Sequence, residues 1–297
     1  SRSHIHLATD LATGQMAALK IPSIDQRGDP AYLKRFMMED WVARRLDSPH
    51  VLKSIPATRP RNFLYVVTEF VDGQTLAQWM IDNPAPDLET VRGIVEQIAK
   101  GLRAFHRKEM LHQDLRPANV MIDRTGTVKI IDFGSTRVAG VIEAAPDLDA
   151  ADVLGTAQYT APEYYLGEGG TTRSDIFSLG VIAYHMLTGR LPYGARVAMA
   201  RTRATQRALT YASALDDDRA IPAWVDEVLK RAVAVDPAKR YEALSEFTHE
   251  LRQPTARNSA TGSRPLAERN PLRFWQVVAM LLLAANLLQL VVTLRGR

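Results

Sequence analysis

The chain has 297 residues, of which 46% are hydrophobic and 24% charged, and its formal net charge at pH 7 is +4. Such a composition supports a folded domain with a sizeable core, and it excludes a disordered chain, a collagen-like repeat and a coiled coil. The absence of cysteine excludes disulfide bridges, a thiolate nucleophile and any metal site built on cysteine.

The N-terminal residues predict a β-hairpin followed by an amphipathic helix. The strands are expected at residues 5–8 and 16–21, and the chain opens inside the strand pattern, so we expect it to be the C-terminal part of a longer protein. Asp29 followed by Pro30 predicts a helix start, with aspartate as the N-cap and proline at the first helical position. Glu39 lies on the apolar face of this helix and therefore needs a partner.

Farther along the chain, the apolar pattern predicts a buried strand, a second hairpin and three helices. The predicted elements are a strand at residues 64–71 with a turn at residues 72–73, a long amphipathic helix at residues 91–105, hairpin strands at residues 119–122 and 128–131, and helices at residues 174–187 and 224–235. No internal repeat is visible among these elements.

The C-terminal residues differ in composition from the rest. Residues 253–273 are rich in Pro, Ser, Thr, Asn and Arg without periodicity, which predicts a linker. Residues 274–294 form a run of 21 residues without a charge, about 31 Å long as a helix. This run predicts a transmembrane helix; the alternative is a buried C-terminal helix. Residues 255–297 hold six arginines and one glutamate, so the basic excess lies in the tail and no nucleic-acid surface is expected.

Two motifs in the middle of the chain carry residues suited to phosphoryl transfer. The segment His-Gln-Asp-Leu-Arg-Pro-Ala-Asn occupies residues 112–119, and an Asp-Phe-Gly motif follows the predicted hairpin at residues 132–134. Together they place Asp114, Asn119 and Asp132 at neighbouring loop ends. One carboxylate can then orient a hydroxyl while the other two side chains offer oxygen ligands to magnesium. The alternative is that each motif is an ordinary turn or helix cap.

With these motifs the chain resembles the eukaryotic-type, or Hanks-type, bacterial serine/threonine protein kinases over about residues 1–251. The other matching motifs are Ala-Leu-Lys ending at Lys20, Glu39, residues 155–163, residues 175–180 and Arg240. The resemblance implies an α+β, two-lobed protein-kinase-like fold. It consists of a small β-rich N-lobe lacking its first strand, at residues 1–71, and a helical C-lobe at residues 72–252, followed by the linker and one transmembrane helix.

The resemblance also implies a role for each residue of the two central motifs. Asp114 would accept or orient the proton of the substrate hydroxyl, and Arg116 would supply a nearby cation in place of the more usual lysine. Asn119 and Asp132 would hold Mg²⁺. The implied cofactors are therefore ATP and Mg²⁺, and the implied substrates are proteins with Ser or Thr acceptors.

The remaining implied site residues bind the nucleotide or support the fold. Lys20, held by Glu39, would contact the α- and β-phosphates of ATP, and the backbone of Glu69 to Val71 would face adenine. The resemblance implies structural or regulatory roles for Gln113, Phe133, Gly134, Thr156, Glu163, Asp175 and Arg240. Among these, Thr156 stands in a Gly-Thr-x-x-Tyr pattern typical of Ser/Thr rather than Tyr specificity.

Two departures from the family pattern carry expectations of their own. The glycine-rich phosphate loop is absent, since its third glycine would fall at Ser3 and the first two before Ser1. Gln113 replaces the arginine that binds an activation-loop phosphate, and residues 137–155 contain no Ser, Thr or Tyr. We therefore predict a kinase that is not switched on by phosphorylation of this loop; the alternative is a loop that is merely acidic.

The sequence as a whole predicts a membrane-anchored Ser/Thr protein kinase, and the alternative is a pseudokinase scaffold that recruits partners at the membrane. A single pass through the inner (plasma) membrane with the kinase domain in the cytoplasm is expected, because more arginines precede residue 274 than follow residue 294. The motifs also resemble the kinase half of bifunctional kinase/phosphatase proteins, which would put a phosphatase domain before Ser1.

The predicted transmembrane segment carries a stripe that favours self-association. Ala279, Asn286 and Thr293 recur every seven residues, and Gln289 lies three residues beyond Asn286. Amide side chains paired across two helices form hydrogen bonds that lipid cannot offer. The alternative is a single helix that tolerates a few amides.

Overall fold

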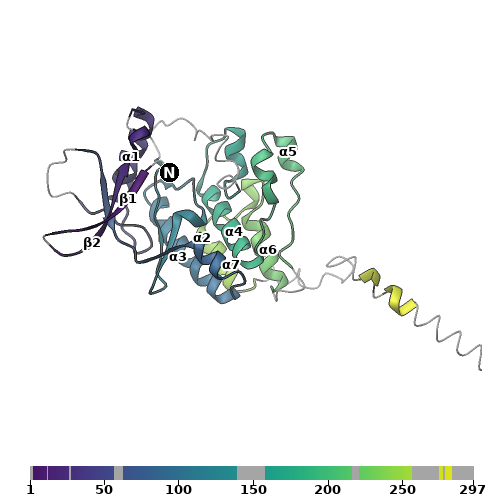
Figure 1. The fold of residues 1–297 in the computed structure, drawn as a ribbon. Helices are drawn as coiled ribbons and strands as arrows, with labels where there is room; N and C mark the ends of the chain where they lie inside the picture. The colour runs from purple at the N-terminus through teal and green to yellow at the C-terminus, as the bar shows by residue number, and fades with distance from the viewer. Residues whose placement is uncertain are drawn as a thin grey trace, which may run out of the picture. The chain divides into compact units, whose positions relative to one another are not determined.

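A three-stranded antiparallel sheet and one helix form the N-terminal part of the chain (Figure 1). In the computed structural model the strands β1 (Ser3–Thr9), β2 (Met16–Pro22) and β3 (Val66–Glu69) are ordered β1-β2-β3. The helix α1 (Pro30–Ala43) begins as predicted, with the Asp29 side chain accepting a hydrogen bond from the Ala31 amide at 2.9 Å. Tyr32 and Phe36 of α1 pack with Val66 of β3 in a small core. The predicted first hairpin is confirmed.

The structure describes residues 3–11, 13–26, 28–56, 63–138, 158–215, 221–255, 274–276 and 278–282. These residues divide between two units, at residues 1–254 and 255–297.

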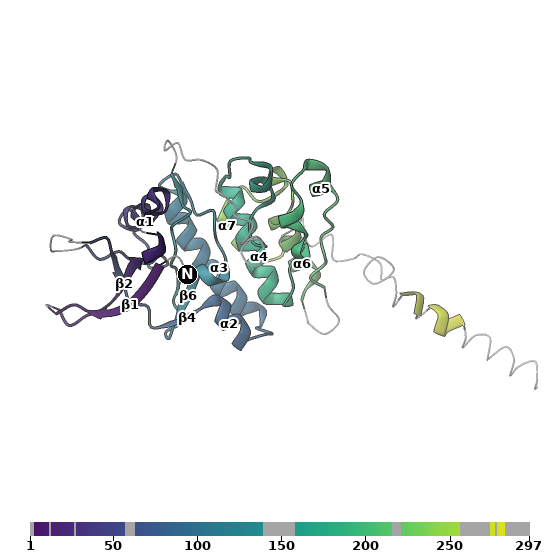
Figure 2. The ribbon, with the colours of Figure 1, turned by 45° about the horizontal axis from the view of Figure 1, so that its top comes forward.

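The C-terminal part of the first unit is mainly helical (Figure 2). Its strands and helices are β4 (Gly73–Thr75), α2 (Leu76–Asp82), α3 (Leu88–His106), β5 (Met110–Leu111), β6 (Val120–Asp123), β7 (Val128–Ile130), β8 (Arg137–Val138), α4 (Thr172–Thr188), α5 (Arg203–Arg207), α6 (Ala223–Ala232) and α7 (Leu244–Arg252). Short 3₁₀ helices lie at Ile24–Gln26, Pro117–Asn119, Pro162–Leu166, Gly194–Met199 and Pro237–Lys239. The helices α3, α4, α6 and α7 pack on one another.

The central helix α4 explains why this part has a large core. Fourteen of its 17 residues are buried, which fits a helix that is apolar on nearly every side. A methyl group on Gly180 would lie 2.8 Å from the Ala232 side chain, so glycine lets α4 approach α6 closely. The structure is thus of the expected α+β class with a mainly helical C-terminal part, and the predicted helices at residues 91–105, 174–187 and 224–235 correspond to α3, α4 and α6.

The sequence expectation was wrong around residues 64–73. The strand there is only four residues long, Val66–Glu69, and the expected turn at residues 72–73 is the start of β4. Gly73 pairs with Asp123 of β6, and a side chain on it would lie 2.0 Å from the Ile122 carbonyl oxygen. A partner 50 residues away therefore turned a local turn signal into a strand.

In the second unit the described residues, 274–276 and 278–282, are helical. Most of the predicted linker, residues 256–273, and residues 283–294 of the predicted transmembrane segment lie outside the described residues. Within the part of the chain that is described, no helix combines the length and the apolar character that a membrane span requires.

Candidate active site

The loop between β5 and β6 holds Asp114 and Asn119 against each other. The Asn119 side-chain nitrogen donates to the Asp114 backbone oxygen at 2.8 Å and to its carboxylate Oδ2 at 2.9 Å. Asn119 is buried at the end of a 3₁₀ turn, so its amide has one fixed orientation. The Arg116 Nε lies 3.5 Å from Asp114 Oδ2, which places a permanent cation beside this carboxylate.

Asp175, at the start of α4, fixes the backbone that precedes Asp114. Its carboxylate is 1% exposed and accepts from the His112 and Gln113 amides, both at 3.1 Å, while the His106 ring nitrogen lies 2.8 Å away. Gln113 has a backbone φ of +66°, a conformation that non-glycine residues rarely adopt. The buried carboxylate stabilises this strained backbone, as is common next to functional groups.

Asp132 and its two neighbours lie directly beside this loop. The Ile131 amide donates to the Asn119 backbone oxygen at 3.0 Å, which joins the two predicted motifs. The Asp132 Oδ1 accepts from the Gly134 amide at 3.0 Å. Phe133 is 1% exposed and packs against the Phe105 ring of α3 at 5.6 Å. The Gly134 amide therefore orients the Asp132 carboxylate, and buried Phe133 fixes the backbone beside it.

Lys20 and Glu39 form an ion pair between β2 and α1. The Lys20 Nζ lies 2.7 Å and 2.6 Å from the two Glu39 carboxylate oxygens, and the two side chains are 19% and 8% exposed. Burial alone would lower the pKa of Lys20, but the Glu39 and Asp132 charges outweigh it and hold this pKa above its ordinary value. Burial raises the pKa of Glu39 to about 7, although Lys20 opposes the shift.

The pKa values of the two central carboxylates, Asp114 and Asp132, are shifted in opposite directions. Burial raises the pKa of Asp114, and Arg116 only partly offsets this. Burial also works against ionised Asp132, but the charge of Lys20 and the Gly134 amide hold the pKa of Asp132 below its ordinary value. Asp132 is thus kept anionic, as a cation ligand should be, whereas Asp114 is the better proton acceptor.

The side-chain oxygens at this site fit a magnesium ion whose other ligands are phosphate and water. The Asn119 nitrogen donates to Asp114, so its side-chain oxygen is the atom that could face a cation, and Asp132 offers its second carboxylate oxygen because the first accepts from Gly134. Mg²⁺ commonly takes only one or two protein oxygens and completes its shell with phosphate and water. Accordingly, the described residues contain no cluster of three His, Cys, Asp or Glu side chains that could enclose a metal.

The predicted adenine-contact segment has a further connection that the sequence did not reveal. The Glu69 carboxylate receives the Lys129 Nζ at 2.8 Å and 2.9 Å and the Lys53 amide at 2.9 Å. This ion pair links β3 to β7, and its only sequence signal is a lysine between two buried residues of a short strand. Val71 is buried two residues beyond Glu69.

Glu163 and Arg240 form a buried ion pair in the mainly helical part of the chain. The two guanidinium nitrogens Nη1 and Nη2 lie 2.7 Å from the two carboxylate oxygens, and the Ser174 hydroxyl donates to Glu163 at 2.6 Å. Arg240 is 0% exposed in its side chain. Thr156, the remaining predicted site residue, and the segment 139–157 around it lie outside the described residues.

Comparison with known proteins adds a family to this geometry. Residues 1–251 match the model of the family described as "Protein kinase domain". The chain is 29% identical over 250 residues to the serine/threonine-protein kinase PrkC of Bacillus subtilis, covering 84% of this chain and 38% of that protein. It is 31% identical over 256 residues to the serine/threonine-protein kinase PknB of Mycobacterium leprae, covering 84% and 40% respectively.

A solved structure has the same architecture. A point mutant of the PknI kinase domain of Mycobacterium tuberculosis superposes with a TM-score of 0.62 at 26% identity, over 84% of this chain and 90% of that one. The chain spans about two fifths of the length of the curated relatives PrkC and PknB.

Proposed function

We propose that this chain, which belongs to the protein kinase domain family, transfers the γ-phosphoryl group of ATP to serine or threonine hydroxyls of proteins. The observation that carries the proposal is the closed Lys20–Glu39 pair, because phosphoryl transfer by this fold needs that pair and the magnesium-binding aspartate in place together. Lys20 is also close enough to Asp132 for its charge to influence that carboxylate.

Each side chain of the site then has one task. Lys20, oriented by Glu39, donates to phosphate oxygens of ATP, and Asp132 and Asn119 hold Mg²⁺. Held there by Asp132 and Asn119, Mg²⁺ would supply positive charge that offsets the negative charge of the phosphates. Asp114 accepts the proton of the attacking hydroxyl, since its raised pKa makes it a better base than an exposed aspartate.

Arg116 and the segment at residues 69–71 complete the site. The Arg116 side chain, 31% exposed, stays beside the Asp114 carboxylate and provides positive charge near the transferred group. The backbone of residues 69–71, anchored through Glu69 and buried Val71, is the segment that would face adenine.

The test is phosphoryl transfer by the full chain with labelled Mg-ATP and a mixed protein substrate. Asp114→Asn and Lys20→Met should each lower transfer by about a hundredfold or more, because one removes the base and the other the phosphate contact. Asp47→Asn and Lys100→Met alter exposed residues and are the matched controls. Equal transfer by the wild type and both site variants would reject the enzyme and favour the pseudokinase scaffold.

We further propose that phosphorylation of residues 137–155 does not activate this kinase. The segment contains no hydroxyl side chain, and Gln113 offers no charge to a phosphate. The Lys20–Glu39 pair is also formed by an unmodified chain. Phosphatase treatment should leave initial rates unchanged. A rate that falls with treatment and returns on incubation with ATP would contradict the proposal, and mass spectrometry would locate the responsible phosphate.

Membrane anchoring is the last part of the proposed function. The uncharged run at residues 274–294, flanked by Arg273 and Arg295, supports one span with the kinase domain on the cytoplasmic side. The full chain should stay in membranes through alkaline extraction, and protease added to spheroplasts should leave the kinase domain intact. Release by alkali or digestion from outside would contradict the proposal.

The anchored protein is also proposed to associate with itself through this segment. The double variant Asn286→Leu with Gln289→Leu should weaken that self-association.

A further inference from the structure

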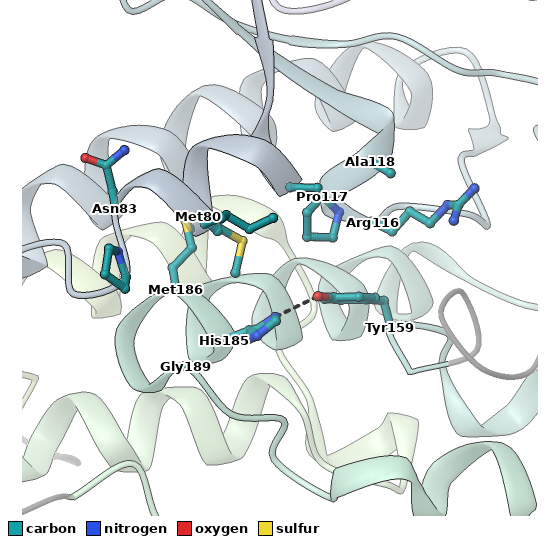
Figure 3. Close-up of a pocket in the computed structure, with 12 residues that line it drawn as sticks. Met80, Asn83, Arg116, Pro117, Ala118, Tyr159, His185, Met186 and Gly189 are labelled. Carbon is teal, nitrogen blue, oxygen red and sulfur yellow. Dashed lines mark hydrogen bonds between the residues drawn. The ribbon is translucent and has the colours of Figure 1, made fainter.

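A cavity of about 470 Å³ opens directly beside the loop that carries Asp114 (Figure 3). Its walls come from α2 and the residues after it, from Arg116 to Ala118, from Tyr159, and from the C-terminal end of α4. Arg116 belongs both to this wall and to the pair with Asp114, whose carboxylate is 3.5 Å away. Whatever fills the cavity therefore lies next to the hydroxyl that Asp114 would receive.

The wall of the cavity is mainly apolar. Met80 and Ile81 of α2 line the cavity together with Met186 of α4, and Figure 3 shows both methionine side chains on its wall. Methionine is flexible and polarisable, so such a wall adapts to apolar side chains of different shape. Ile81 is 72% exposed at the rim, which leaves the cavity open to an incoming chain.

The charge of the wall excludes a basic occupant. None of the described residues that line the cavity carries a carboxylate, and its one permanent charge is the guanidinium of Arg116. Tyr159 and His185 are hydrogen-bonded to each other, Oη to Nδ1 at 2.7 Å. Burial lowers the pKa of His185 and raises that of Tyr159 to about 12, so both stay neutral at pH 7.

We propose that this cavity is a specificity pocket for a large apolar side chain, such as Leu, Met or Phe, of the substrate segment that carries the acceptor Ser or Thr. The proposal rests on the proposed kinase function and adds a substrate class to it. An extended chain advances about 3.3–3.6 Å per residue, so the occupant comes from within a few residues of the acceptor. Lysine or arginine at that position finds no carboxylate among the described residues that line the cavity and meets the guanidinium of Arg116 instead.

The first experiment is a positional peptide library phosphorylated by the full chain with Mg-ATP. At one position near the acceptor, large apolar residues should be preferred over Lys and Arg by about tenfold to a hundredfold in kcat/KM, as burial of one such side chain allows. Equal use of apolar and basic residues at every position would overturn the pocket while leaving the kinase function intact.

Two variants test whether this cavity is the source of the preference. His185→Glu introduces a carboxylate into the wall and should shift the preference at that same position toward Arg or Lys. His249→Glu adds the same charge to exposed α7 and should change nothing. Ile81→Lys, at an exposed rim position that folding does not need, should weaken the apolar preference severalfold. A preference unchanged in both pocket variants would overturn the assignment.

A binding measurement separates failure of the pocket from failure of the kinase. Methyl resonances of Met80 and Met186, assigned through Met80→Leu and Met186→Leu, should shift when a peptide with the apolar residue is added to the full chain. A peptide with arginine at that position should not shift them. If no peptide is phosphorylated but the shifts appear, the pocket stands and the proposed activity falls. If the shifts are absent, the pocket is rejected.

Discussion

The two lobes each contain a lysine or arginine paired with a glutamate, and the two pairs are built differently. In the N-lobe, Lys20 reaches Glu39 across the gap between a strand and a helix, beside a core of only three buried residues. In the C-lobe, the five N–H groups of Arg240 are all used: two bond Glu163 and the others bond the backbone carbonyls of Ala234, Arg173 and Val235.

This difference fits the proposal that the N-lobe pair binds a ligand, whereas the C-lobe pair supports the fold. A fully hydrogen-bonded, unexposed arginine cannot change partners without leaving buried groups unsatisfied. An exposed fraction of 19% leaves Lys20 reachable by phosphate oxygens, and its one carboxylate partner sits on a separate helix. We therefore expect changes at the C-lobe pair to reduce stability and changes at the N-lobe pair to reduce activity.

The largest expected effect comes from breaking the C-lobe pair. Arg240→Leu leaves the Glu163 carboxylate buried with Ser174 as its one remaining hydrogen-bond partner among the described residues, so the free energy of unfolding should fall by about 3–5 kcal/mol. Arg252→Leu removes an exposed pair with Glu89 and Glu96 and is the control, with an expected loss of about 1 kcal/mol or less. Denaturant unfolding of the full chain measures both. Equal losses in the two variants would remove the contrast between the lobes.

Asp175→Asn should lower stability less than Arg240→Leu does, and it should also lower activity strongly. In Asp175→Asn, one side-chain oxygen faces the three donors that two carboxylate oxygens now serve, so at least one buried group loses its acceptor. We expect about 1–3 kcal/mol lower stability and about a hundredfold lower kcat, because the strained Gln113 backbone positions Asp114. The measurement is kcat at a temperature where the variant is folded. Normal kcat would show that the loop holds its geometry without this carboxylate.

The contribution of the Lys20–Glu39 pair should be visible in the pH dependence of activity. The pKa of Glu39 is raised by burial to about 7, so Glu39 becomes protonated as the pH falls through 7 and releases the charge that holds Lys20. The kcat/KM for ATP should therefore decline below about pH 7. Glu39→Gln should be less active at neutral pH and lack that acidic decline, whereas exposed Glu89→Gln should keep it.

Glu39 should also make the free energy of unfolding depend on pH, in the opposite direction to the activity. A carboxyl whose folded pKa lies above its unfolded value favours folding most when protonated. Its contribution is complete below the ordinary pKa of 4.5 and is lost as the pH rises through about 7. The wild type should accordingly lose stability relative to Glu39→Gln between these pH values. An identical pH dependence of unfolding in the two proteins would show that Glu39 is not desolvated.

The smallest effect is expected at the ion pair that joins the lobes. Lys129→Met frees the Glu69 carboxylate, and because the two side chains are 13% and 28% exposed, stability should change by about 1 kcal/mol or less. The KM for ATP should rise a few-fold with kcat nearly constant, since Glu69 anchors the segment that is proposed to face adenine. Lys100→Met is the matched control. A change in kcat with KM constant would place the role of this pair elsewhere.

Elements and motifs were predictable where residue types close together in the sequence identify them. The Asp29 cap, the two hairpins and the long helix α3 follow from local signals, and the motifs at residues 112–119 and 132–134 lie side by side because a hairpin joins them. The short helices α2 and α7 escaped prediction, with seven and nine residues respectively. Helices of this length draw their stability from tertiary packing more than from their own sequence.

The sequence by itself determined the family resemblance, the order of the elements and the candidate chemistry, since these depend on residue type and spacing along the chain. Tertiary structure alone decided the partners of Asp175, of Glu69 and of Gly73, which lie 62, 60 and 50 residues away from them. It also brought Met80, Tyr159 and Met186 to one cavity. The physical reason is that periodicity describes which face of an element is apolar, whereas contacts between distant elements arise only when the whole core packs.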